Sequence, residues 1–94
     1  MSHPYDEIIV DSTRKIRTFD QHVPADELIW HRDREDRIVR VLESRGWYLQ
    51  MDDSLPVLLE AERVYEIPRE SWHRIIRKNN CGNLVVEITE KIRR

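Results

Sequence analysis

Residues 31–46 read HRDREDRIVRVLESRG, and this stretch decides between a helical and a β-rich fold. A helix that begins near Pro24 and ends near Gly46 would contain all of it, since Pro and Gly are common at those two ends. However, residues 31–37 contain no apolar side chain. A helix that faces a core needs an apolar side chain at every third or fourth position. Two strands joined by a charged turn therefore fit better, with the second strand in residues 38–42.

Short apolar runs rich in Val, Ile and aromatic residues recur along the chain, separated by turn residues. Such runs are typical of strands, and a spacing of roughly 8–12 residues is typical of a sandwich or barrel. Residues 69–78 stay open between strand and helix, because Ser71 could cap a helix containing Trp72 and Ile75. We expect about nine strands, in residues 8–10, 16–19, 28–30, 38–42, 47–51, 55–59, 64–67, 75–76 and 84–88.

Length and charge indicate a single domain over residues 1–94, with no preference for nucleic acid. Charged residues make up 36% of the chain, yet the formal net charge is only −2. A nucleic-acid-binding domain is expected to carry a clear basic excess, so nucleic acid is an unlikely partner. The N-terminus lacks a signal-peptide pattern, and no apolar run approaches the ~20 residues of a membrane span. Cys81 is the only cysteine, and together these features predict a cytoplasmic protein.

Three potential metal ligands lie close to predicted strands. If residues 30–33 are extended, His31 and Asp33 share one face, because side chains alternate along a strand. His73 follows another predicted strand and Pro68. Two histidines and one carboxylate form the ligand set that holds iron(II) with open coordination positions, and zinc or manganese could use the same ligands.

The order of these residues resembles the two sequence motifs of the cupin superfamily. In residues 31–46, His31 and Asp33 take the places of the family's first two histidines, and Gly46 falls near its closing glycine. Pro68 and His73 have the spacing of the second motif, within residues 67–76, IPRESWHRII. The resemblance covers roughly residues 26–88 and extends to small cupin-like proteins carried by tailed phages. It implies an all-β fold, a small jelly-roll β-barrel of the cupin type.

The chain departs from the family pattern at three positions. Asp33 replaces the second histidine, Arg37 stands where the resemblance places a glutamate ligand, and Glu70 stands where it places a glycine. A four-ligand site is therefore absent, which leaves a three-ligand site of His31, Asp33 and His73. Arg37 would share the face of these residues. It could clamp an anionic substrate with its planar guanidinium, or it could pair with Asp33 in place of a metal.

Three further side chains are candidates for substrate binding together with Arg37. Trp30 and Trp72 each adjoin a predicted ligand, so they could line a cavity rather than fill the core. Gln50 could offer a polar group inside the barrel, if its strand turns that face inward.

Two functions of different classes follow from these features. The first is a metal-dependent protein that binds or transforms a small anionic molecule at His31, Asp33 and His73. The second is a non-catalytic binding or interaction module on a metal-free barrel, and the sequence does not decide whether the protein is an enzyme. We also expect a homodimer, because pairing through an edge strand near residues 8–10 would satisfy exposed backbone groups.

Overall fold

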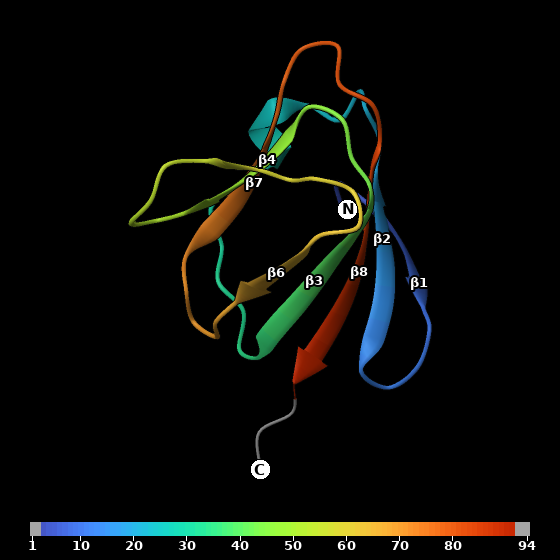
Figure 1. Ribbon diagram of the computed structural model, residues 1–94, viewed down its shortest axis with the longest axis vertical. Helices are drawn as coiled ribbons and strands as arrows, with labels where there is room; N and C mark the ends of the chain where they lie inside the picture. The colour runs from blue at the N-terminus through green and yellow to red at the C-terminus, as the bar shows by residue number, and fades with distance from the viewer. Residues whose placement is uncertain (1–2, 92–94) are drawn as a thin grey trace.

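A computed structural model of the chain describes residues 3–91, which form eight strands and one short 3₁₀ helix (Figure 1). The elements in chain order are β1 (Asp6–Ile9), β2 (Arg14–Phe19), the 3₁₀ helix η1 (Ala25–Glu27), β3 (Asp36–Glu43), β4 (Trp47–Met51), β5 (Val57–Leu58), β6 (Val64–Ile67), β7 (His73–Arg77) and β8 (Leu84–Lys91). The helical element within residues 3–91 is three residues long, so this part of the chain contains no membrane-spanning helix.

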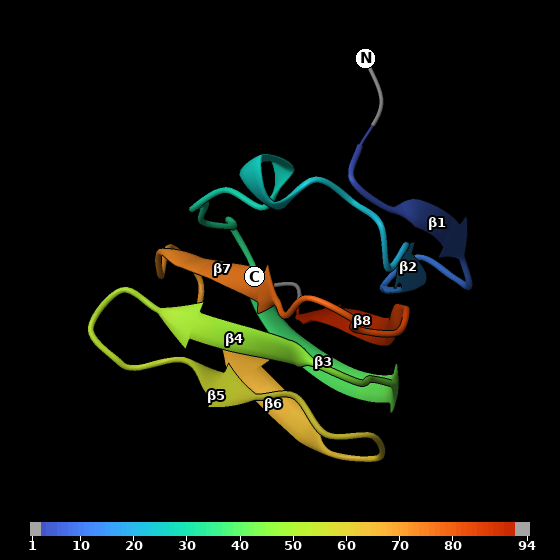
Figure 2. The same ribbon diagram turned by 90° about the horizontal axis from the view of Figure 1, so that it is seen from above.

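The strands form two antiparallel sheets that face each other as layers (Figure 2). The larger sheet has the order β1-β2-β8-β3-β6, and the smaller has the order β5-β4-β7. The predicted all-β class is confirmed, and the arrangement is consistent with a jelly roll. The sheets do not close into the predicted barrel, because β1 and β6 end the larger sheet, and β5 and β7 end the smaller one.

The predicted strands match the observed ones except at residues 28–30. Those residues follow η1 as irregular chain, and the Leu28 amide caps η1 by donating to the carbonyl oxygen of Ala25. Only His31 then pairs with another strand. Residues 69–78, which the sequence left open, form the strand β7 rather than a helix. Ile75 packs against the core from this strand.

The core lies between the two sheets and is built from alternate residues of the central strands. Trp47, Leu84 and Val41 are its largest fully buried side chains. The Trp47 indole Nε1–H donates to the carbonyl oxygen of Gly82 at 2.8 Å, so the buried ring keeps its one polar group satisfied. Burying the ring in this way stabilises the layer contact by about 3 kcal/mol.

A close approach near Trp47 explains two residues that the sequence singled out. Gly46 has φ +82°, and a Cβ there would lie 3.0 Å from the Cβ of Cys81. Only glycine suits both this backbone conformation and this contact. Cys81 is buried, and its thiol donates to the carbonyl oxygen of Gln21 at 3.5 Å. Cys81 is thus a packing residue at this crossing.

Candidate metal centre

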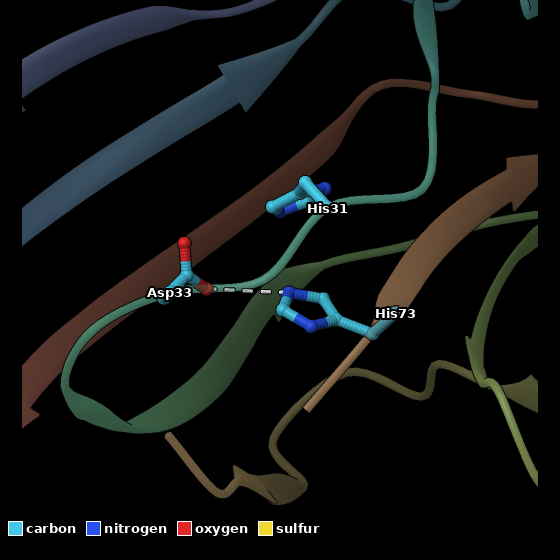
Figure 3. A group of neighbouring side chains, drawn as sticks. All are labelled: His31, Asp33 and His73. Carbon is cyan, nitrogen blue, oxygen red and sulfur yellow. Dashed lines mark ion pairs between the residues drawn. The ribbon is translucent and has the colours of Figure 1, made fainter. Parts of the chain in front are cut away.

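His31, Asp33 and His73 come together at one end of the two sheets (Figure 3). His31 and Asp33 lie in the segment between η1 and β3, and His73 is the first residue of β7. One potential ligand atom from each residue lies within 4.8 Å of the other two. The structure therefore assembles the predicted ligand set from two segments that are distant in the sequence.

A pair of backbone hydrogen bonds holds the two histidines opposite each other. The His31 amide donates to the carbonyl oxygen of His73 at 3.0 Å, and the His73 amide donates to that of His31 at 2.9 Å. Directly paired residues present their side chains on the same side of the sheet. The two imidazole ring centroids consequently lie 4.3 Å apart.

Each imidazole is oriented by a backbone carbonyl two residues earlier. The Nδ1 atom of His31 lies 3.1 Å from the carbonyl oxygen of Ile29, and that of His73 lies 2.8 Å from the carbonyl oxygen of Ser71. A carbonyl only accepts hydrogen bonds, so we assign the proton of each neutral ring to Nδ1. Nε2 then carries the free lone pair, which is the arrangement of metal-binding histidines.

The Asp33 carboxylate faces the free nitrogen of His73. Asp33 Oδ2 lies 3.3 Å from His73 Nε2, beyond the 2.7–2.9 Å of a charge-assisted hydrogen bond. This oxygen is buried and accepts no hydrogen bond from the residues that the structure describes. Two lone pairs thus point at each other across a short gap, where a cation would be stabilised.

The turn before β7 fixes Asp33 and His73 relative to each other. The Glu70 amide donates to the carbonyl oxygen of Asp33 at 2.7 Å, and Ser71 in the same turn orients the His73 ring. Glu70 has φ 61°, the left-handed conformation that glycine favours. The position where the family resemblance implies a glycine therefore keeps a glycine-like backbone in this chain.

Arg37 lies beside the three candidate ligands and contacts two carboxylates. Its Nη1 is 3.3 Å from Asp33 Oδ2, and its Nη2 is 3.0 Å from Glu90 Oε2. Glu90 in turn lies 3.4 Å from the Lys15 ammonium. Both terminal nitrogens of Arg37 are thus engaged, and the guanidinium pairs with Asp33, which was one of the two roles left open by the sequence.

Burial and neighbouring charges shift the pKa values of His31 and Asp33. His31 is exposed at the rim of the site, yet partial burial of its ring lowers its pKa against the hydrogen bond with Ile29, and the neighbouring His73 lowers it further. Burial raises the pKa of Asp33, but the positive charge of Arg37 acts in the opposite direction, and that pKa lies below its usual value. At neutral pH, His31 is therefore neutral and Asp33 is ionised, as a metal site requires.

A cavity of about 280 Å³ opens between the sheets next to these residues. His31, His73 and Arg37 line it, and most of the remaining wall consists of apolar side chains from both sheets. Sites for small molecules commonly have this form, a mainly apolar hollow with a few convergent polar groups.

The other three predicted substrate-binding residues do not line this cavity. Trp30 and Trp72 are 37% and 43% exposed. The guanidinium of Arg74 lies over the Trp30 ring at 4.7 Å, and that of Arg32 lies over the Trp72 ring at 5.1 Å. These pairs occupy the positions that alternate with His31 and His73, so they lie on the opposite face. Gln50 accepts a hydrogen bond from Arg74 Nε at 3.0 Å.

Sequence reasoning missed Glu90 and Lys15. Glu90 continues the alternation of the buried Leu84, Val86 and Ile88, which places it on the inner face of β8. Lys15 lies opposite Ile88 in the β2–β8 pairing, so it shares this face. The alternation in residues 84–90 was the signal that could have identified Glu90.

Solved structures with the same architecture identify the fold. A cupin domain from Bordetella pertussis matches 98% of this chain and 99% of its own chain, with a TM-score of 0.62 and 20% identity. A cupin-2 domain protein from Shewanella frigidimarina matches over 95% and 79%, with a TM-score of 0.63 and 17% identity. The chain has a cupin fold.

A larger protein of known structure shares this architecture over part of its chain. The FeII form of HppE matches 93% of this chain and 48% of its own chain, with a TM-score of 0.69 and 9% identity. No family model matches the chain, and no curated protein matches it in sequence. The predicted resemblance to cupins is thus confirmed at the level of the fold, and the narrower resemblance to phage proteins stays a prediction.

Proposed function

We propose that this cupin-fold protein binds one divalent metal ion through His31, Asp33 and His73, and binds or transforms a small anionic molecule there. The observation that carries the proposal is the buried Asp33 Oδ2, which accepts no hydrogen bond from residues 3–91 and lies 3.3 Å from both His73 Nε2 and Arg37 Nη1. Two imidazole nitrogens and one carboxylate oxygen suit iron(II), manganese(II) or zinc(II). Iron has additional support, because one neighbour with this fold contains iron(II).

The chain's own residues prepare the site for such an ion. The carbonyl groups of Ile29 and Ser71 fix the ring orientations of the two histidines. Arg37 keeps Asp33 ionised and restricts the carboxylate to one direction. When bound, the ion would supply Lewis acidity and leave coordination positions for an anionic ligand, because three protein ligands do not complete its coordination shell.

Thermal unfolding with added iron(II), manganese(II) or zinc(II) tests the metal site. An ion that binds the folded state at a hundredfold excess over its Kd stabilises that state by about 2.7 kcal/mol. We expect at least one of the three ions to raise the Tm, and we expect His73→Ala to abolish the increase. His22→Ala is the matched control, since His22 is exposed and lies outside the ligand group. A wild-type Tm that stays unchanged with all three ions would refute the proposal.

A metal-free binding module is the second candidate, and the Arg37 contacts favour it. The guanidinium already supplies a positive charge to Asp33 and Glu90, which is the charge that a metal would otherwise supply to Asp33. On this hypothesis, added ions leave the Tm unchanged while loss of Arg37 destabilises the fold. The same melting experiment therefore separates the two candidates.

A further inference from the structure

The wall of the cavity differs in character from the metal-binding end. Its apolar side chains come from both sheets and from the segments after η1 and β5, among them Leu28, Leu49, Leu59, Ile75, Val86 and Ile88. No serine, threonine, asparagine or glutamine of residues 3–91 is among the lining residues. A polar molecule with several hydroxyl groups would lose hydrogen bonds to water there without replacement.

The charged residues of the wall already have partners or are exposed. Arg37 contacts Asp33 and Glu90 through its two terminal nitrogens. Arg17 Nε lies 2.7 Å from Glu7 Oε1. A phosphate is best recognised by an arginine whose planar group is free to form two parallel hydrogen bonds, and neither arginine offers this. The exposed carboxylate of Glu27 also lines the cavity and would repel a second negative charge.

The size of the cavity limits the occupant. A cavity of 150 Å³ accommodates benzene, so the observed 280 Å³ holds roughly ten non-hydrogen atoms. A molecule of this size fills the apolar part and still places one end at His31 and His73.

Resting on the proposed function, we infer that the ligand is a small monocarboxylate with an uncharged apolar body of roughly ten non-hydrogen atoms in all. The carboxylate provides the negative charge for the metal-binding end. The apolar body occupies the space between the sheets, in contact with residues such as Val86 and Ile75. A sugar phosphate of similar size does not fit this distribution of groups.

Calorimetric titration of the zinc-loaded protein with octanoate, acetate, octyl phosphate and 1-octanol tests the inference. Each methylene that becomes buried tightens binding about fourfold, so we expect octanoate to bind at least a hundredfold more tightly than acetate. Octanoate should also bind more tightly than octyl phosphate and 1-octanol. Equal affinity for octanoate and acetate, or tighter binding of octyl phosphate, would overturn the inference while leaving the metal site intact.

A matched pair of variants on β7 tests whether the apolar body occupies the cavity. Ile75 lines the cavity, whereas its neighbour Ile76 does not. Ile75→Phe should reduce octanoate affinity at least tenfold and leave acetate affinity unchanged, while Ile76→Phe should change neither. The Tm of each variant without zinc reports whether the variant folds. The increase in that Tm on adding zinc reports whether it still binds the metal. If zinc does not raise the Tm of the wild type, both the proposed function and this inference are refuted. If the two folded variants bind octanoate equally well, this inference alone is refuted.

Discussion

Replacing Arg37 by Met removes the central charge of the site and keeps the bulk of the side chain. The side chains of Arg37 and Asp33 are only 11% and 12% exposed, and that of Glu90 is 24% exposed. A buried group left without its partner costs about 1–3 kcal/mol, and more when it is charged. Glu90 retains Lys15, so most of the loss falls on Asp33. We therefore expect a total loss of about 3 kcal/mol without metal, a large share of the stability of a small domain.

Differential scanning calorimetry with a chelator present measures this loss. For a chain of this length, 1 kcal/mol corresponds to about 4–8 °C, so the Tm should fall by roughly 12–24 °C. Arg40→Met on the same strand is the control, because Arg40 contacts Glu62 at the surface, with exposed fractions of 50% and 71%. That exposed pair should contribute at most about 1 kcal/mol. Equal, small shifts for the two variants would show that Arg37 does not stabilise the site.

Three further predictions concern the turns and the edge of the larger sheet. Glu70→Gly should raise stability by about 1 kcal/mol in urea unfolding, because φ 61° strains any residue except glycine; a loss would contradict this. The pKa of Asp11 is lowered to about 2 by the Thr13 amide and by Arg14, so its contribution to stability is complete above the ordinary 3.8 and is lost as the pH falls towards 2. An NMR titration giving an ordinary value would refute that assignment. Light scattering should give twice the 11.5 kDa chain mass, and Ile8→Lys on the edge strand β1 should give the monomer, whereas a wild-type monomer would exclude the dimer.

The fold could be predicted from the sequence because its strands carry local signals. Residues 38–42 and 84–88 combine β-branched side chains with flanking turn residues, and both lie inside strands β3 and β8. Residues 28–30 show the limit of this reasoning. They are apolar like a strand, yet Leu28 packs on the core while Ile29 is 65% exposed, and they find no strand partner. Whether an apolar segment forms a strand depends on whether the tertiary structure offers it a partner strand. The apolar run alone does not contain that information.

The three candidate ligands could be predicted from their residue types and their spacing in the sequence. The residues that contact them could not be predicted in this way. Nothing near Arg37 in the sequence indicates that it meets Glu90, since the contact joins residues far apart in the chain across the β3–β8 pairing. Likewise, Trp30 and Trp72 adjoin the histidines in sequence, but strand alternation places them on the other face. Adjacency along a strand separates side chains, and direct cross-strand pairing brings them together.

The backbone pair between His31 and His73 has a topological consequence. The two residues lie 42 positions apart in a chain that has a single cysteine and cannot form an internal disulfide. An ion held by both imidazoles would act as a reversible cross-link that closes this loop. Because such an ion would leave when the chain unfolds, its contribution would grow with the free-ion concentration relative to its Kd, to about 2.7 kcal/mol at a hundredfold excess. Metal supply would then set the lifetime of the folded chain, in the way that redox conditions set it for a disulfide-bonded domain.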